Sequence, residues 1–152
     1  MTSAFKKAWA EVVQPMISRP RRLQVAALCC REGDKGAKVL LITSRDTGRW
    51  ILPKGWPIDG LTAPDAALQE AWEEAGVKKA RIRRKPVGSY EYDKRLEGGV
   101  PVPVDVKVYR VDVDKLADTY PEADERRRRW VSPQEAAELV DEDSLKTLLR
   151  QM

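Results

Sequence analysis

Three glutamates, Glu70, Glu73 and Glu74, stand close together in the segment 68–77, "LQEAWEEAGV". Spacings of three and four residues place side chains on one side of an α-helix, where like charges repel each other by a few tenths of a kcal/mol per pair. A magnesium ion reverses the sign of this interaction, because it binds carboxylate oxygens together with waters and substrate phosphates. The spacing therefore predicts either a magnesium site or a solvated acidic helix face.

The chain has 152 residues and contains no histidine. This excludes the commonest general base, the commonest zinc ligand and every serine–histidine triad. Two cysteines are too few for a structural zinc site. Hydrolytic chemistry would therefore depend on carboxylates, on lysines or on a metal ion that prefers oxygen ligands.

The residues before the glutamates favour the magnesium site. Gly55 lies in a loop rich in glycine and proline, "PKGWPIDGL", and a glycine lets a backbone carbonyl approach a metal ion closely. Arg45, Arg49 and Lys54 are also near in the sequence. The net charge of +4, from 28 basic and 24 acidic residues, suits an anionic partner but does not require one.

The glutamates need a helix, and the segment around them carries the signals of one. Thr62, followed three residues later by Asp65, resembles a capping box, and Pro64 falls in the first turn. Gly76 is well placed to end the helix. Apolar residues recur between these signals with helical spacing and predict the buried side: Ala67, Leu68, Ala71, Trp72 and Ala75.

The segments before this helix predict a helix, a hairpin and a short extended piece. Residues 4–14 have the spacing of a short amphipathic helix that stops at Pro15. The apolar runs 23–30 and 37–44 flank a turn-like segment, "REGDKG", and predict two strands of a hairpin. Residues 49–53 continue as an extended piece that ends at Pro53.

The segments after the helix predict strands at 80–92, 100–113 and 126–131, followed by two helices, the first of them capped by Ser132. In the second strand the apolar alternation steps by three residues after Val108, which suggests a bulge near Tyr109 and Arg110. Two prolines, at 101 and 103, suggest that this strand begins at a sheet edge.

Length and composition bound the class of protein. The interleaved strands and helices, without a repeat or linker, predict one α+β domain. No run approaches the ~18 apolar residues of a membrane span, and the N-terminus lacks the features of a signal peptide. Cys29 and Cys30 are adjacent and should point to opposite faces of a strand, so they are poor disulfide partners, and we expect a reducing, cytoplasmic location.

The segment 55–77 resembles the signature box of the Nudix hydrolases, in which a glycine, a glutamate and the pattern Arg-Glu-apolar-x-Glu-Glu-x-Gly-apolar follow at fixed spacing. The matching residues are Gly55, Glu70, Ala71, Glu73, Glu74, Gly76 and Val77. Leu61 and Gln69 replace a glutamate and an arginine that form a structural ion pair in the family. The joint loss of both is milder than the loss of one, because neither partner is left as an unpaired charge.

Further segments are similar to the diphosphoinositol and diadenosine polyphosphate phosphohydrolases of this superfamily: "RRLQVAALCCRE", "VLLITSRDTGRWILPKG", "GSYEYDKR" and "ERRRRWVSPQEA". The resemblance implies an α/β/α sandwich around a mixed β-sheet over residues 21–152, and it leaves residues 1–20 as an N-terminal helical extension. It also implies magnesium-dependent attack of water on a phosphoanhydride, with Mn²⁺ as the alternative metal.

The expected roles of the glutamates follow from this chemistry. Metal ions held by Glu70 and Glu74 would neutralise phosphate charge and lower the pKa of bound water. Glu73 would be a further ligand or hold a bridging water, and the resemblance implies that a carbonyl of Lys54 or Gly55 completes the coordination. Without histidine, one carboxylate must take the proton of the water, and we favour Glu74.

Phosphate-binding residues are expected from their positions in the resemblance. They are Thr43, Ser44, Arg45, Lys54 and Arg95, with Arg22 as a looser match. Arginine suits phosphate because its planar fork bonds two oxygens. The arginines at 126–129 would alternate along a strand and are interpreted mainly as solvated. Trp56 is interpreted as a plug over the core before a base-stacking residue.

Four functions remain open. The leading one is a magnesium-dependent pyrophosphohydrolase of a small-molecule polyphosphate, either a dinucleoside polyphosphate or a diphosphoinositol polyphosphate. The second is another Nudix specificity, such as ADP-ribose, a nucleotide or an RNA 5′ end. The third is a phosphate-binding module without turnover, suggested by Leu61 and Gln69. A nucleic-acid-binding domain is disfavoured because acidic residues nearly balance basic ones. No membrane partner is expected, and the oligomeric state is left open.

Overall fold

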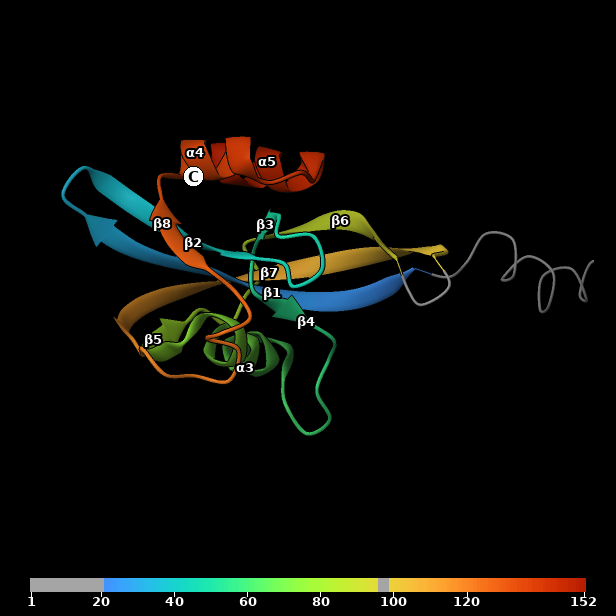
Figure 1. Cartoon of the computed structure of the whole chain (residues 1–152), viewed down its shortest axis with the longest axis horizontal. Helices are drawn as coiled ribbons and strands as arrows, with labels where there is room; N and C mark the ends of the chain where they lie inside the picture. Colours follow the sequence, from blue (N-terminus) through green and yellow to red (C-terminus); the bar gives the residue numbers. More distant parts are fainter. Residues whose placement is uncertain (1–20, 96–98) are drawn as a thin grey trace, which may run out of the picture.

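A mixed β-sheet between two helical layers forms the centre of the molecule (Figure 1). The computed structural model describes residues 21–95 and 99–152. Within these ranges eight strands make one sheet; α3 covers one face and α4 and α5 cover the other. This arrangement confirms the expected α/β/α sandwich. The helix predicted at 4–14 lies outside the described residues.

The sheet is built around β1 (Arg22–Gly33), which confirms the predicted hairpin. β1 pairs antiparallel with β2 (Gly36–Thr43) and parallel with β7 (Pro101–Leu116). Two short strands join next to the hairpin: β3 (Trp50–Ile51) pairs with β2, and β4 (Lys54–Gly55) pairs with β1. β4 contacts α3, so the sheet meets the next helix of the chain at this strand.

The long strand β7 has partners on both sides. Along one edge, β6 (Gly88–Arg95) pairs with its first half and β5 (Val77–Ile82) with its second half. The parallel register with β1 runs without a break from Val104 to Asp112, so the predicted bulge near Tyr109 and Arg110 is wrong. The apolar step marks a change of the buried face instead, because Val108 packs in the core below α4 and α5, whereas Tyr109 packs in the core below α3.

The helix α3 (Ala63–Ala75) begins and ends at the predicted residues. Thr62 Oγ1 accepts a hydrogen bond from the Asp65 N–H at 3.3 Å, and Gly76 ends the helix with a φ of +72°, a left-handed conformation that favours glycine. The buried side consists of small residues that let the helix lie close to the sheet: Ala66, Ala67, Ala71 and Ala75. Leu68 and Trp72 are only partly buried.

The C-terminal part supplies the second helical layer. β8 (Arg128–Val131) pairs with β2, and Ser132 caps α4 (Pro133–Leu139) as predicted. α5 (Asp143–Arg150) follows and packs beside β6. No helix within the described parts of the chain is long and apolar enough to cross a membrane.

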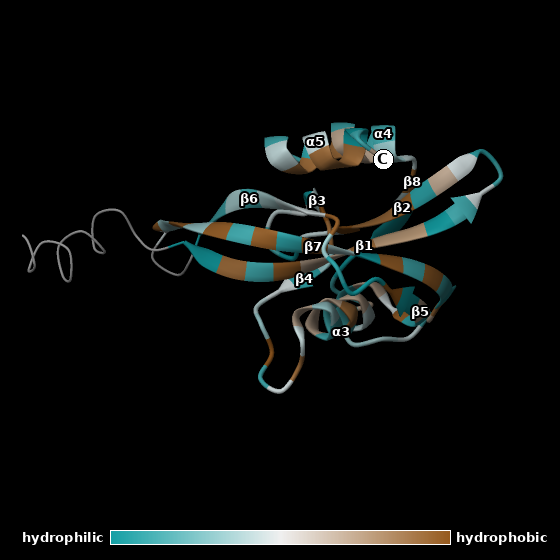
Figure 2. Cartoon of the chain, turned by 180° about the vertical axis from the view of Figure 1, so that it is seen from behind, coloured by the Kyte–Doolittle hydropathy of each residue, from teal (hydrophilic) through white to brown (hydrophobic). Residues whose placement is uncertain are grey.

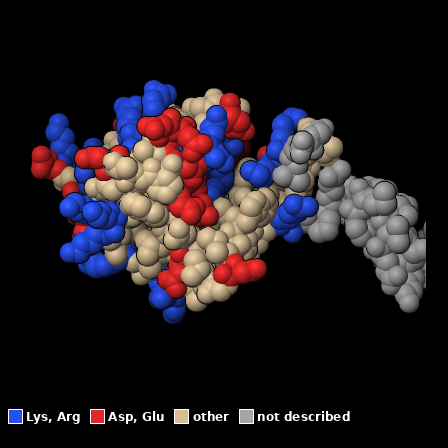
Figure 3. Space-filling view, turned by 60° about the horizontal axis from the view of Figure 1, so that its bottom comes forward, with Lys and Arg blue, Asp and Glu red and all other residues tan. Residues whose placement is uncertain are grey.

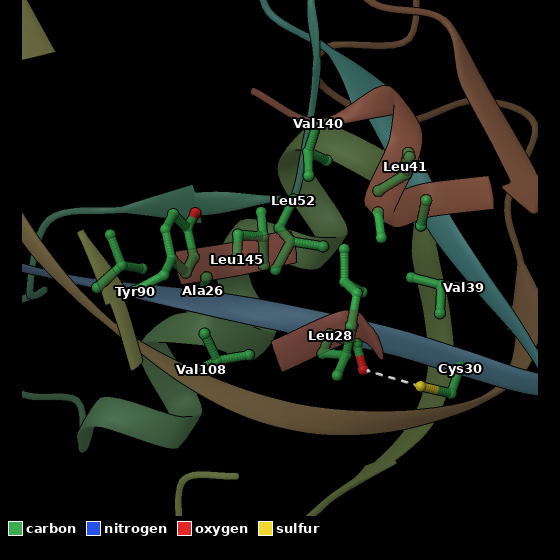
Figure 4. Packing of buried hydrophobic residues seen from close by; sticks show 14 of the residues in the cluster. Ala26, Leu28, Cys30, Val39, Leu41, Leu52, Tyr90, Val108, Val140 and Leu145 are labelled. Atoms are coloured by element: carbon green, nitrogen blue, oxygen red, sulfur yellow. Dashed lines mark hydrogen bonds between the residues drawn. The ribbon is translucent and has the colours of Figure 1, made fainter. Parts of the chain in front are cut away.

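The two faces of the sheet carry separate hydrophobic cores. Residues 25–30 of β1 are all apolar and enter the two cores alternately, because successive side chains of a strand point to opposite faces. In the first half of β7, apolar and polar residues alternate instead (Figure 2). Cys30 packs in the core with Leu28, Leu41 and Leu145 (Figure 4), whereas Cys29 packs in the core beneath α3. The two cysteines therefore point to opposite faces of the strand, as predicted. Both are free.

Candidate active site

A cleft of about 920 Å³ opens where the loop after β2, the β4 segment, α3 and β6 meet. Most of the expected site residues line it, although they come from distant parts of the sequence: Ser44, Arg45, Lys54, Gly55, Glu70, Glu74 and Arg95. The antiparallel pairing of β4 with β1 and the docking of α3 under the sheet bring them together. The cleft is therefore the candidate active site.

Glu70 and Glu74 form a carboxylate pair on α3. Glu74 is only 3% exposed, and burial together with a side-chain hydrogen bond to Glu70 raises its pKa to about 9. Burial also raises the pKa of Glu70. Two neighbouring carboxyl groups in a poorly solvated place tend to share a proton, because two adjacent negative charges repel each other. A divalent cation can replace that proton, so the pair has the chemistry of a metal site.

Gly55 lies directly against Glu70. A Cβ atom at position 55 would stand 2.5 Å from Glu70 Oε1, so any other residue here would push the carboxylate away from the backbone of β4. Among residues 21–95 and 99–152, no three acidic, cysteine or histidine side chains form a ready-made metal cage. Magnesium fits this open arrangement, because it uses one or two carboxylates and completes its shell with waters and phosphates.

Arg126 is a buried cation in the cleft that the sequence interpretation underestimated. Its side chain is 8% exposed, and Nη2 lies 3.2 Å from Glu74 Oε1 and 3.0 Å from Glu122 Oε1. The alternation predicted for the arginines at 126–129 could have identified it, since Arg126 and Arg128 are both partly buried while Arg127 is exposed. Arg128 has a structural contact instead, donating to the Ala75 carbonyl at the end of α3.

A second ion pair lines the cleft near β6. Arg49 Nη1 donates to Glu142 Oε1 at 2.6 Å, and Glu142 Oε2 is buried without a hydrogen-bond partner. Lys54 lies over the ring of Tyr92, with Nζ 5.1 Å from the centroid, and burial lowers the pKa of Lys54 to about 8. Nothing in the sequence pointed to Glu142, because its position depends on how α5 docks.

Three of the expected site residues do not line the cleft. Arg22 is exposed at the start of β1, and the hydroxyl of Thr43 accepts the backbone N–H of Arg127 at 2.9 Å. Glu73 Oε1 accepts a hydrogen bond from Gln69 Nε2 at 2.9 Å. The roles assigned to these three residues remain predictions that the shape of the cleft does not support.

The side chains of Ser44, Arg45 and Arg95 are placed differently within the cleft. The hydroxyl of Ser44 accepts the Arg49 N–H at 3.1 Å and so shapes the loop after β2. Arg45 and Arg95 are largely exposed, and each makes only weak or backbone contacts, such as Arg95 Nη1 with the Gly99 carbonyl at 3.2 Å. Trp56 is 37% exposed and lines the cleft rather than covering the core.

Sequence comparisons match residues 20–152 to the model of the NUDIX domain. Nudix hydrolase 13, mitochondrial, of Arabidopsis thaliana is 33% identical over 123 residues, covering 75% of this chain and 58% of the relative. Nudix hydrolase 21, chloroplastic, of the same plant is 31% identical over 121 residues, covering 78% and 58%. The chain thus spans a little more than half the length of these relatives.

Solved structures share the fold at low sequence identity. The C. elegans Ap4A hydrolase superimposes with a TM-score of 0.62 at 19% identity, covering 87% of this chain and 96% of that one. The NUDIX domain of Shewanella oneidensis NrtR, solved with ADP ribose, gives a TM-score of 0.64 at 19% identity, covering 99% and 98%. Identities this low support a common architecture and leave the ligand of this chain to its own residues.

Proposed function

Because the chain belongs to the Nudix family, we propose that it is a magnesium-dependent hydrolase of phosphoric anhydrides. The observation that carries the proposal is the Glu70–Glu74 pair, in which the carboxyl group of Glu74 is buried and hydrogen-bonded to that of Glu70, and Glu70 lies against the backbone of Gly55. Burying two acids side by side costs folding free energy, and a bound cation removes that cost. Such an arrangement is expected where a metal ion is bound during function.

Within this proposal both residues of the pair face the metal. Glu70 and Glu74 would hold it together with the carbonyl of Gly55, and a bound ion would neutralise phosphate charge and lower the pKa of a water. Glu74 accepts the proton of the attacking water. In the metal-free protein, Arg126 beside Glu74 favours its ionised form.

The proposed substrate carries a long phosphate chain. Arg45, Arg95 and Lys54 line the cleft with Glu70 and Glu74, so a chain of phosphates could contact the metal and these cations together. We favour a dinucleoside polyphosphate over a diphosphoinositol polyphosphate, because acidic side chains outnumber basic ones in the lining by eight to six. A fully phosphorylated inositol ring would demand an excess of positive charge, whereas a nucleoside is neutral and could stack on the exposed Trp56.

The remaining specificities are alternatives within the same chemistry. ADP-ribose, a nucleotide or an RNA 5′ end would place two or three phosphates at the metal and leave Arg45 and Arg95 unused. A polymeric nucleic acid is disfavoured, since acidic and basic side chains lie side by side on the face that carries α3 (Figure 3). We keep the cytoplasm as the proposed location on the ground that Cys29 and Cys30 are both free.

A substrate panel tests the proposal. Diadenosine tetra- to hexaphosphates, diphosphoinositol pentakisphosphate, ADP-ribose and a triphosphorylated RNA would each be incubated with and without Mg²⁺, and phosphate and nucleotide release would be measured. We expect hydrolysis of the dinucleoside polyphosphates only with the metal. Absence of turnover on every substrate with Mg²⁺ or Mn²⁺, combined with tight binding of one of them, would favour the phosphate-binding module.

A further inference from the structure

Arg126 is the counterion of two carboxylates in the cleft, the buried Glu74 and the partly buried Glu122. Its Nη2 contacts Glu74 Oε1 at 3.2 Å, and its Nη2 and Nε contact Glu122 Oε1 at 3.0 and 3.1 Å. Nη1 donates to the carbonyl of Thr43 at 3.1 Å. The guanidinium is therefore held on three sides in a place where 92% of its side chain is shielded from water, with an exposed fraction of 8%.

No other cation in the described part of the chain forms an ion pair with Glu74. Of the ion pairs shorter than 4.0 Å there, only the one with Arg126 involves a glutamate of α3. Gln69, which lies on α3, donates to Glu73 and carries no charge. Glu122 is tied to the same helix, because its N–H donates to the Glu73 carbonyl at 2.9 Å. The loop before β8 thus delivers both Arg126 and Glu122 to the proposed metal site.

We infer that Arg126 competes with the divalent metal for Glu74, so that it holds the metal-free site together and must release Glu74 when the metal binds. The inference rests on the proposed metal site at Glu70 and Glu74. A magnesium ion sits about 2.1 Å from its carboxylate oxygens, and Arg126 Nη2 already occupies the front of Glu74 Oε1. Two cations on one oxygen repel each other strongly where water is scarce.

Release would not remove Arg126 from the cleft. Its contacts with Glu122 and the Thr43 carbonyl do not involve Glu74, so they can keep the guanidinium at the edge of the site. A planar fork that turns away from a carboxylate is well suited to two oxygens of a phosphate. Metal binding would thereby convert an internal counterion into a phosphate-binding group that contacts the substrate in the proposed reaction.

The test is a calorimetric titration of the full chain with MnCl₂ in the absence of substrate. Arg126→Gln should bind Mn²⁺ about 10-fold more tightly than wild type, which is the coupling expected when one competing charged contact is lost. Arg126→Lys keeps the charge but cannot reach all the acceptors at once, and it should fall between the two. Arg129→Gln is the matched control, because Arg129 pairs with the partly exposed Glu135. The Mn²⁺ affinity of this variant should stay at the wild-type value.

If Arg126 has only a structural role, its replacement will not increase the Mn²⁺ affinity. If Arg126 only orients Glu74 for the metal, Arg126→Gln will bind Mn²⁺ equally or more weakly, and the inference is overturned while the metal site stands. If no protein of the series binds Mn²⁺, the proposed metal site itself fails. If Arg126→Gln does not fold, Arg126→Lys replaces it in the test: a higher Mn²⁺ affinity than wild type supports the inference, and an equal or lower affinity overturns it. In thermal melts, the rise in Tm on adding Mn²⁺ should be larger in Arg126→Gln than in wild type.

Discussion

Glu74 and Glu142 are two buried carboxylates in one cleft, and their neighbours differ. Glu74 is 3% exposed and Glu142 is 9% exposed, and each has one arginine partner, Arg126 at 3.2 Å and Arg49 at 2.6 Å. The second neighbour of Glu74 is the carboxyl group of Glu70, whereas Glu142 Oε2 has no partner. Glu74 therefore has a second carboxyl group beside it, whereas the direct neighbour of Glu142 is the guanidinium of Arg49.

This difference separates a reactive site from a supporting one. An acid buried beside another acid has a raised pKa, because the ionised state lacks both water and a sufficient counter-charge. Such a group can bind a metal ion or a proton. Its burial does not stabilise the fold by itself, which is typical of a functional site. The pair of Arg49 with Glu142 instead joins the loop after β2 to the start of α5. It holds one wall of the cleft in place.

The largest expected effect distinguishes the two glutamates directly. Glu74→Gln keeps the shape of the side chain and removes the charge, so we expect turnover to fall by about 100-fold or more, since a metal and its activated water supply several kcal/mol. Glu142→Gln still offers an acceptor to Arg49 and should cost less than about 10-fold. The measurement is kcat for both variants on the best substrate, with circular dichroism to confirm folding. Equal losses would contradict the separation.

The next effect concerns the exposed arginines of the cleft. Arg45→Ala and Arg95→Ala should reduce kcat/KM for penta- and hexaphosphates more than for ADP-ribose, because a short substrate can use the metal alone. A hydrogen bond to a charged group contributes about 1.5–3 kcal/mol, so each loss should lower the preference for long chains by roughly 10- to 150-fold. Arg129→Ala, outside the cleft, serves as the control. An unchanged ratio would make Arg45 and Arg95 ordinary surface charges.

A smaller effect should appear in the stability of the metal-free protein. The pKa of Glu74 is raised in the folded state, so folding retains a proton that the unfolded chain releases, and stability is highest at or below the ordinary carboxyl range. It should then fall as pH rises toward about 9, by at most about 1.4 kcal/mol per pH unit. Lys54, with a lowered pKa of about 8, acts in the opposite direction only above that value.

The pH range 5.5–7.5 therefore isolates the carboxylate pair. Tm measured in EDTA should decrease across this range in wild type and should change much less in Glu74→Gln, which cannot titrate at that position. A wild-type Tm that is flat or rises with pH would mean that the pair is ionised without a metal. In that case the contrast between Glu74 and Glu142 would not rest on excess charge.

The smallest effect concerns the two departures from the family box. Leu61 and Gln69 are both uncharged. Leu61 is 43% exposed, and Gln69 donates a hydrogen bond to Glu73. Leu61→Glu and Gln69→Arg together should be tolerated better than either alone, with a coupling of up to about 1 kcal/mol for a partly exposed ion pair. A double-mutant cycle of thermal melts measures it. Additive effects would show that the two sites do not interact.

Local signals predicted most of the elements. The hairpin of β1 and β2, the cap at Thr62, the stop at Gly76 and the cap at Ser132 all depend on residues within a few positions of each other. Their physical causes are backbone hydrogen bonds, φ preferences and the spacing of apolar side chains, and these act over one or two turns. The prediction of a bulge in β7 was wrong, because the same apolar step arises when the buried side chains change from one face of the sheet to the other.

The glutamates of α3 and the glycine before them could also be identified from spacing, since a helix places positions 70 and 74 on one side wherever it occurs. The identity of their partners could not. Arg126 and Glu142 reach the cleft because β8 pairs with β2 and α5 docks beside β6, and Glu142 lies 93 residues from Arg49. Spacing along a chain records neighbours on one element, whereas counterions are chosen by the packing of distant elements. The sequence therefore supplied the metal-binding chemistry, and the tertiary packing supplied the charges that control it.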